Sequence, residues 1–385
     1  MSDATIGRRT LLRAAGLTGA AAVGAAPAML GPAPAAAAVP STLPTRSDLI
    51  AVCRRVNDHW IGAHADPGDN QWARATYFSG DMALHRVTGE ARYLSYARRW
   101  AEQANYGLNG GTATRHADNH TAGQVYYDLY DTSADPATLT STNESIRLMV
   151  YGAQASKIND WTWVDALHMA MPVFARVARF RRDDAYLTKM FGLYTHTKKT
   201  TRLYDYPAEL WYRDSKFVPG GSESTTKNGK PVFWSRGNGW AIAAHAKTLG
   251  LLDATETRWP EYRANLQGVA RSLARTQRSD GFWNVNLGDS ADYPGPETSG
   301  TALFVFGLSY GIRVGLLDRA TYLPVVARAW NGMVATAGQA DGFLGYVQGV
   351  GHKPSSSQPV TVTKTADFGV GAFLLGGSEL SKLAS

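Results

Sequence analysis

The sequence contains a single cysteine, Cys53, among 385 residues. One thiol excludes an intramolecular disulfide framework of the kind that stabilises many exported domains. Cys53 lies in the amphipathic stretch LIAVCRRVNDHW, a pattern that favours a buried small apolar side chain over a catalytic thiol. The fold must therefore rely on a buried core, and a chain with 44% hydrophobic and 18% charged residues can form a large one.

Long apolar runs and clusters of like charge are also missing. After residue 38 there is no stretch of about 18 apolar residues, so we expect no membrane span in the mature protein. The formal net charge of +7 is spread without a basic arm, which argues against nucleic acid as a partner. The positive net charge weakly favours an acidic small substrate. We also expect the protein to be a monomer.

Residues 1–38 differ in composition from the rest of the chain. Arg8 and Arg9 precede a short run rich in Ala and Gly, and the segment ends in APAAAAVP, with an A-x-A cleavage site that ends at Ala38. This pattern is typical of a twin-arginine export signal, and the short run followed by proline argues against a membrane anchor. We predict a signal peptide over 1–38, one catalytic domain over 39–385, and a secreted or periplasmic protein.

Strand patterns are scarce, and helical periodicity fills the chain with two alternating kinds of helix. Amphipathic, charged helices are predicted at about 49–60, 91–103, 143–154, 184–197, 261–276 and 321–335. Nearly apolar helices, rich in small residues, are predicted at about 74–87, 118–130, 163–178, 238–251, 298–315 and 367–380. A helix that is apolar on all sides must be covered on all sides, so the second set should lie inside the first.

The charged helices resemble one another. ARYLSYARRWA, DAYLTKMFGLY and ATYLPVVARAW share a Tyr-Leu pair near the start, and recurring helical hairpins indicate a closed ring of repeats. We therefore predict an all-α (α/α)6 barrel with six outer and six inner helices. In such a toroid the starts of the inner helices surround the mouth of a funnel, where site residues should gather.

Two aspartates occupy such starts. Asp118 opens the predicted helix 118–130 and is either an N-cap or a carboxylate at the funnel mouth. Asp165 lies in the almost wholly apolar segment WTWVDALHMAMPVFARVARF. Burial without a partner raises the pKa of a carboxyl, which a general acid requires. The alternative for Asp165 is a carboxylate satisfied by the backbone or by an arginine in the core.

The stretch FWSRGNGW, residues 233–240, combines groups that suit a sugar acid. Trp234 and Trp240 offer flat faces, Arg236 offers a forked cation for a carboxylate, and the glycines permit close backbone approach. The alternative is a turn before a helix, with tryptophans in the core. Glu297, in YPGPETSGTALF, occupies a comparable position before another inner helix.

A histidine pair raises the question of a metal. His116 and His120 are four residues apart, but Ala117 stands where a zinc-protease motif needs glutamate, and no third ligand group is evident. We therefore predict neither a metal site nor another cofactor.

Taken together, these motifs resemble the unsaturated uronyl hydrolases of glycoside hydrolase families 88 and 105, especially the unsaturated rhamnogalacturonyl hydrolases. The matching segments follow the family's order over nearly the whole chain after residue 38: ADNHTAGQVYYDLY, WTWVDALHMAMPVFA, FWSRGNGW, DGFW, PGPETSGTALF and DFGVGAFLL. The resemblance implies an (α/α)6 barrel without a cofactor. It also implies release of the terminal 4,5-unsaturated uronic acid from lyase-generated oligosaccharides, by hydration of the C4=C5 enol ether.

The resemblance also implies roles for individual residues. Asp165 matches the catalytic aspartate that protonates C4 and helps to deliver water to C5. Asp118 matches a second aspartate, which holds sugar hydroxyls and keeps Asp165 protonated. The predicted substrate-binding residues are Trp72, His116, Trp163, Arg213, Trp234, Arg236, Asn238, Trp240 and Glu297. Arg213 stands where family members carry a substrate-contacting histidine, which puts that contact in question.

Several activities remain open. Unsaturated rhamnogalacturonan-type disaccharides are the favoured substrates, and an unsaturated glucuronyl hydrolase acting on another acidic polysaccharide is the alternative. The same fold could also carry a conventional glycosidase, a lyase or a non-catalytic glycan binder. A conventional glycosidase needs a second acid placed for chemistry at the anomeric carbon, and a binder has no use for Asp165.

Overall fold

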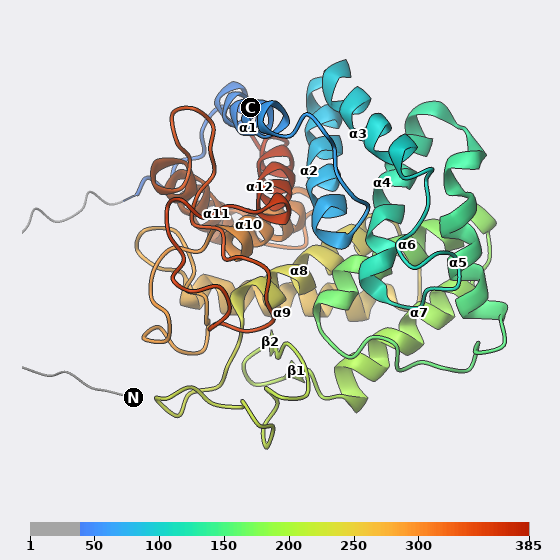
Figure 1. Cartoon of the computed structure of the whole chain (residues 1–385). Coiled ribbons are helices and arrows are strands. Elements are labelled where there is room, and N and C mark those ends of the chain that lie inside the picture. Colours follow the sequence, from blue (N-terminus) through green and yellow to red (C-terminus); the bar gives the residue numbers. More distant parts are fainter. Residues whose placement is uncertain (1–38, 385) are drawn as a thin grey trace, which may run out of the picture. The chain divides into compact units, whose positions relative to one another are not determined.

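The computed structural model describes residues 39–384, which form a ring of helices (Figure 1). The α-helices are α1 (Arg46–Ala63), α2 (Trp72–Thr88), α3 (Ala91–Gln103), α4 (Ala117–Ser133), α5 (Thr140–Tyr151), α6 (Asp165–Arg181), α7 (Ala185–Thr195), α8 (Ser235–Leu249), α9 (Trp259–Thr276), α10 (Thr298–Arg313), α11 (Arg319–Thr336) and α12 (Asp367–Leu380). The predicted signal peptide, 1–38, lies outside the described residues. Within 39–384, no helix has both the length and the apolarity needed to cross a bilayer.

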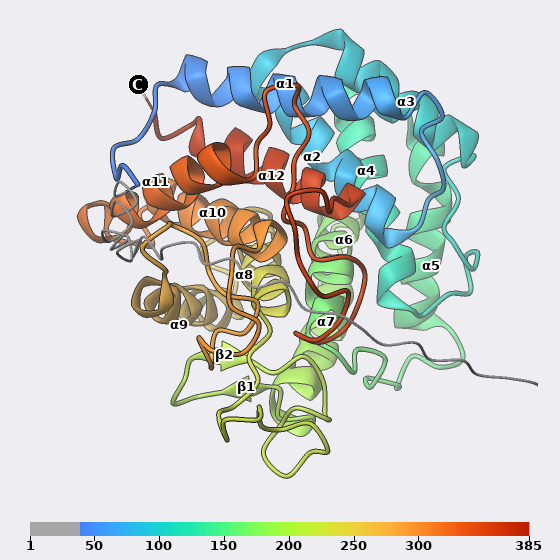
Figure 2. The same cartoon turned by 60° about the vertical axis from the view of Figure 1, so that its left-hand side comes forward.

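The even-numbered helices form a closed inner ring. α2, α4, α6, α8, α10 and α12 pack against one another in that order, and α12 packs back onto α2 (Figures 1 and 2). The odd-numbered helices cover this ring from outside. α10 is buried on every face from Thr298 to Ile312, whereas α3 buries one stripe that includes Tyr93 and Trp100. The predicted (α/α)6 barrel is therefore confirmed.

Glycines let the inner helices approach closely at the point where the ring closes. Gly80 of α2 faces Gly371 of α12, and a Cβ on Gly80 would lie 2.3 Å from the Gly371 carbonyl oxygen. A Cβ on Gly371 would likewise lie 2.3 Å from the Thr76 carbonyl oxygen. Because these neighbours are backbone atoms, no side-chain rotation can relieve either clash.

Gly80→Ala is therefore expected to destabilise the fold by about 2–3 kcal/mol, the upper range for overpacked cores. Gly62→Ala is the matched control, since Gly62 lies in outer helix α1 with nothing within 4 Å of the added Cβ. Alanine there should stabilise the helix by up to about 1 kcal/mol. Urea unfolding of both variants checks this prediction, and equal stability of Gly80→Ala and wild type would contradict it.

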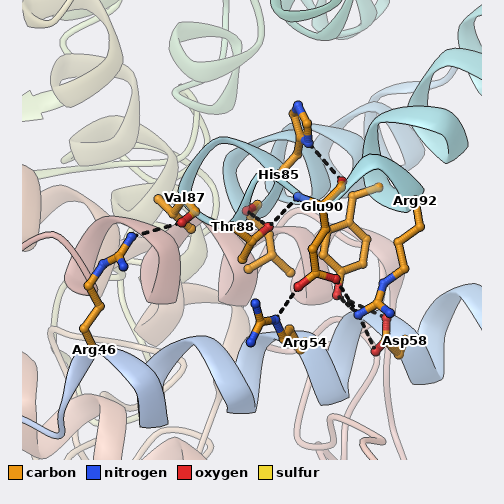
Figure 3. A network of polar contacts seen from close by, with 10 residues as sticks. Arg46, Arg54, Asp58, His85, Val87, Thr88, Glu90 and Arg92 are labelled. Atoms are coloured by element: carbon orange, nitrogen blue, oxygen red, sulfur yellow. Dashed lines mark hydrogen bonds and ion pairs between the residues drawn. The ribbon is translucent and has the colours of Figure 1, made fainter.

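A network of ion pairs joins outer helix α1 to the junction of α2 and α3 (Figure 3). Glu90 pairs with Arg54 of α1 and lies 2.6 Å from Arg92, which in turn lies 3.0 Å from Asp58 of α1. These side chains are partly exposed, and such pairs contribute at most about 1 kcal/mol each. The network therefore joins α1 to its neighbours but adds little to the stability of the fold.

The remaining regular elements are short. They are a 3₁₀ turn at Pro136–Leu139, a π turn at His196–Thr200, and an antiparallel pair of strands, β1 (Tyr204–Asp205) and β2 (Leu210–Trp211). None of these short elements was predicted from the sequence. The β2 strand matters for the site because Arg213 lies two residues after its end.

Cys53 is buried in α1, and burial raises the pKa of its thiol to about 12. A thiol that stays protonated is a poor nucleophile. The structure thus agrees with the prediction of a small apolar core residue.

Candidate active site

A cavity of about 210 Å³ lies at the starts of the inner helices, where the sequence analysis placed the site. Eight predicted site residues line it: Trp72, Asp118, Trp163, Asp165, Arg213, Trp234, Arg236 and Trp240. Four further residues complete the wall: Met169, Val350, Gly351 and His352. The cavity is large enough for about one sugar ring and carries aromatic faces, two carboxyl groups and two guanidinium groups.

Asp165 is the first residue of α6, so the predicted start at 163 was two residues too early. The preceding chain is held elsewhere, because the Val164 amide donates to the Arg213 carbonyl at 2.8 Å. The Asp165 side chain is 10% exposed, and its Oδ2 accepts from Arg213 Nε at 3.3 Å. Its Oδ1 is buried without a hydrogen-bond partner. The carboxyl is therefore only half satisfied.

The electrostatics of Asp165 follow from that arrangement. Burial raises the pKa of Asp165, and the neighbouring guanidinium groups of Arg213 and Arg236 oppose this rise. The arginine partner considered from the sequence is thus present, yet it does not cancel the effect of burial. A carboxyl poised in this way can hold a proton and also release it.

Asp118 lies in the first turn of α4, whose N-cap is His116, so it is not the cap that the sequence allowed. Burial raises the pKa of Asp118 to about 7; the charge of Asp165 adds to this rise and Arg213 opposes it. Because both carboxyl groups have raised pKa values, each holds its proton to a higher pH than an exposed aspartate does.

Arg213 connects the acid to the cavity. Its Nη1 donates to Asp214 Oδ2 at 2.8 Å while its Nε contacts Asp165. The side chain is 23% exposed, so part of the guanidinium remains open to the cavity that it lines. An anionic substrate group could reach it without displacing main-chain hydrogen bonds.

The contacts of Arg236 differ from the predicted capture of a substrate carboxylate. It is 1% exposed, and its Nη1 and Nη2 donate to the carbonyl oxygens of Gln348 and Gly349 at 2.5 and 2.9 Å. Its guanidinium carbon lies 4.5 Å from the Trp234 ring centroid and 4.7 Å from that of Phe368. Burial lowers the pKa of Arg236 to about 10. Its fork therefore holds a loop of the cavity wall, and its geometry does not favour the predicted capture of a carboxylate.

The glycines of FWSRGNGW also have a different use from the predicted one. α8 begins at Ser235, three residues before the predicted start, so both glycines are helical. A Cβ on Gly239 would lie 2.9 Å from the Leu303 side chain of α10, and one on Gly237 would lie 3.2 Å from the Val164 side chain. These glycines therefore admit neighbouring parts of the protein instead of a ligand.

Asn238 and Glu297 are fully buried and lie outside the cavity lining. Asn238 Oδ1 accepts from the Trp211 amide at 2.8 Å, which fixes β2. Glu297 caps α10 by accepting from the amides of Ser299 and Gly300 at 2.9 and 2.7 Å. Since their polar atoms already serve the fold, the predicted contacts with substrate are corrected to structural roles.

The two histidines of HADNH do not converge. His116 lies at the cavity rim, with its ring centroid 4.9 Å from that of Trp163 and its Nδ1 3.8 Å from Asp118 Oδ2. His120 is buried, and its Nε2 lies 3.0 Å from Ser145 Oγ. Among residues 39–384 no group of three or more His, Cys, Asp or Glu side chains is arranged to hold a metal ion.

The loop that brings Val350, Gly351 and His352 to the cavity was not predicted from the sequence. Gln348 fixes this loop, since its Oε1 accepts from Trp234 Nε1 at 2.9 Å and its Nε2 donates to the Ser356 carbonyl at 2.7 Å. No periodicity marks the segment. A histidine preceded by the two glycines of GVGH was the one available cue.

A closed ring of helices with a carboxyl pair, arginines and tryptophans at one mouth defines a carbohydrate-active (α/α)6 toroid. Comparison with known sequences identifies the family within this class. Residues 51–384 match the family model described as Glycosyl Hydrolase Family 88, and the chain belongs to that family. The protein is thus a glycoside hydrolase.

Individual relatives agree with this membership. The chain is 30% identical over 328 residues to an unsaturated 3S-rhamnoglycuronyl hydrolase of Formosa agariphila, which covers 81% of this chain and 84% of the relative. It is 21% identical over 238 residues to an unsaturated rhamnogalacturonyl hydrolase of Bacillus subtilis, covering 58% of this chain and 65% of the relative. The structure of a glycosyl hydrolase family 88 protein from Bacteroides vulgatus superposes with a TM-score of 0.82 at 37% identity, covering 88% of this chain and 99% of that one.

Proposed function

We propose that the protein releases the terminal 4,5-unsaturated uronic acid from lyase-generated oligosaccharides by hydrating the C4=C5 enol ether. The observation that carries this proposal is the pair Asp165 and Asp118, two carboxyl groups with raised pKa values that line one cavity of about 210 Å³. Protonation of an enol ether carbon needs an acid of this kind, and tryptophan faces suit a single sugar ring.

The proposed reaction uses Asp165 twice. Its protonated carboxyl donates to C4, and the positive charge that develops at C5 is captured by water, whose proton returns to the Asp165 carboxylate. The resulting hemiketal opens by breaking the bond between C5 and the ring oxygen. That oxygen then belongs to a hemiacetal at C1, which collapses and releases the neighbouring sugar. Asp118 holds sugar hydroxyls beside this centre.

Arg213 is the best placed cation for the substrate carboxylate. Its side chain is 23% exposed at the cavity, whereas Arg236 is buried and bonded to two carbonyl groups. A carboxylate bound to Arg213 would offset the guanidinium charge beside Asp165. The pKa of Asp165 would then rise further, so substrate binding itself would favour the acid form.

The names of the relatives guide the choice of substrate. One is a rhamnoglycuronyl and another a rhamnogalacturonyl hydrolase, so rhamnose next to the unsaturated uronic acid is common to both. The rhamnoglycuronyl hydrolase is the more similar of these two. The C4=C5 double bond removes the C4 stereocentre that distinguishes glucuronate from galacturonate, so the choice lies in the neighbouring sugar and its linkage. We therefore propose an unsaturated uronyl-rhamnose disaccharide, with or without sulfate on the rhamnose, as the first substrate to test.

The test is a panel of four unsaturated disaccharides: β-linked uronyl-rhamnose, its rhamnose-sulfated form, α-linked uronyl-rhamnose, and a uronyl-hexosamine. Loss of ultraviolet absorbance reports hydrolysis, and kcat/KM should be highest for a uronyl-rhamnose member. Turnover of the uronyl-hexosamine alone would overturn the preference for rhamnose but keep the reaction. No turnover of any member would overturn the reaction itself.

Export is a further part of the proposal, supported by the Arg8–Arg9 pair and the cleavage pattern before Val39. The second part is a monomeric state of the mature chain. The exported protein should begin at Val39 on N-terminal sequencing. Size-exclusion chromatography should give a single-chain mass, and a dimer peak would correct the second part.

A further inference from the structure

A second cavity, of about 270 Å³, lies toward the opposite ends of the inner helices from the active-site cavity. We call it the rear cavity. It is lined by residues from the middle to the C-terminal ends of all six inner helices, whereas residues near the N-terminal ends of α2, α4, α6 and α8 line the active-site cavity. Its charged and amide residues are Arg86, Gln124, Asp128, Arg176, Lys247, Glu379 and Lys382. None of them belongs to the proposed catalytic machinery.

The charges of the rear cavity do not balance. Its lining carries the cations Arg86, Arg176, Lys247 and Lys382 against the carboxylates Asp128 and Glu379, which leaves two positive charges uncompensated. Just outside the lining, Asp131 pairs with Arg176 and Arg313 pairs with Glu379. These two add one charge of each sign, so the excess of two remains. A divalent anion would neutralise it.

Lys247 of α8 is the least satisfied of these cations. Its Nζ donates to Gln124 Oε1 at 2.8 Å, and no carboxylate oxygen of residues 39–384 lies within the 4.0 Å that defines an ion pair. Burial lowers the pKa of Lys247 to about 7. An ammonium has three hydrogens to donate, so this group has bonding capacity left for an anion.

The position of Lys247 follows from a proline in α6. Pro172 has no N–H, so the His168 carbonyl lacks its usual partner in the helix. Gln124 Nε2 donates to that carbonyl at 2.7 Å, which orients the amide and directs its Oε1 to Lys247. The ammonium is thus held in one place by the inner ring, as a binding site requires.

We propose that the rear cavity is a binding site for a small divalent oxyanion, sulfate or phosphate, held by Lys247 and Arg86. Arg86 is the other available donor, since one nitrogen contacts Asp128 at 3.0 Å while its side chain is 48% exposed. Arg176 is already engaged by both Asp128 and Asp131. The site is independent of the proposed function, because it shares no lining residue with the active-site cavity.

Binding should depend on pH with a definite sign. The groups that face Lys247 across the cavity are Arg86 from α2, Asp128 from α4, Arg176 from α6, Tyr310 from α10, and Glu379 and Lys382 from α12. Since Lys247 has a lowered pKa, sulfate should bind well at pH 6 and progressively less as the pH rises and the ammonium loses its proton. Sulfate stays divalent over this range, so the ligand itself does not contribute.

The test is calorimetric titration of the mature chain with sodium sulfate at pH 6 and low ionic strength. Wild type should bind one sulfate, and Lys247→Met should weaken binding at least about tenfold by removing a charged donor. Arg86→Gln should also weaken it, and this half-exposed position keeps the test valid if Lys247→Met fails to fold. Arg92→Gln is the matched control, because Arg92 is similarly exposed and lies outside the cavity.

The outcomes are distinct. Equal sulfate affinity of Lys247→Met, Arg86→Gln and wild type overturns the proposal, as does the absence of saturable binding to wild type. Loss of binding in Arg213→Gln but not in Lys247→Met also overturns it, since the sulfate would then occupy the active-site cavity. Inorganic phosphate, which is mainly monovalent at pH 6, should bind more weakly than sulfate to wild type and should likewise lose affinity in Lys247→Met. Hydrolysis by Lys247→Met should match wild type, which separates this site from catalysis.

Discussion

Asp165→Asn is expected to lower kcat at least about 10³-fold, within the range that general acid–base groups contribute. The amide keeps the size of the carboxyl but can neither protonate C4 nor take a proton from water. Arg213, which now donates to Asp165 Oδ2 at 3.3 Å, can still donate to the amide oxygen, so the fold should survive. Ultraviolet absorbance of an unsaturated uronyl disaccharide measures the loss.

Asp81→Asn is the matched control for removing a buried carboxyl from the inner ring. Asp81 lies in α2, is fully buried, and accepts from Asn57 Nδ2 at 2.7 Å. Burial raises the pKa of Asp81 well above its usual value, which favours its neutral form, so an amide should change its charge little. Its kcat should stay within about threefold of wild type. Activity retained by Asp165→Asn would remove Asp165 from the proposed mechanism.

The second large effect is a fall in kcat/KM of about tenfold for each pH unit above neutrality. Both Asp165 and Asp118 have raised pKa values, the latter about 7, so the pair loses its last proton as the pH rises through this region. The form with one proton is the acid that the reaction needs, and it is abundant below the transition. A pH–rate profile on one disaccharide checks the sign and the slope.

The variant Asp118→Asn distinguishes a proton shared by the two carboxyl groups from the titration of Asp165 as an isolated acid. Without the Asp118 charge nearby, Asp165 ionises more easily, so the alkaline fall should move to lower pH. The amide can still hold a sugar hydroxyl, which keeps the variant measurable below the transition. An unchanged profile would mean that the two carboxyl groups do not share a proton.

Twelve helices could be predicted from sequence because their cause is local. The apolar run of α10 and the stripe of α3 each specify a helix and its layer without reference to distant residues. The first residues of the helices were predicted less exactly. α6 begins at Asp165 because the residues before it bond to the chain near Arg213, a contact that no local pattern reveals.

The cavity could be predicted in part for the same reason. Residue types at the starts of the inner helices indicated eight of its residues, among them Asp118 and Asp165. The partners of buried polar groups could not be read from the sequence, since Arg236 bonds to carbonyls more than 100 residues away. Asn238 and Glu297 were misassigned on that account, because residue type does not show whether a polar group is already satisfied.

The central claim is that the enzyme hydrates the C4=C5 double bond instead of displacing at the anomeric carbon. The most direct measurement is nuclear magnetic resonance of the products formed from an unsaturated uronyl disaccharide in deuterated water. Our account predicts one deuterium at C4 of the released acid, loss of the vinyl proton signal, and an open-chain ketone at C5. A released uronic acid that keeps its double bond and carries no deuterium at C4 would contradict it.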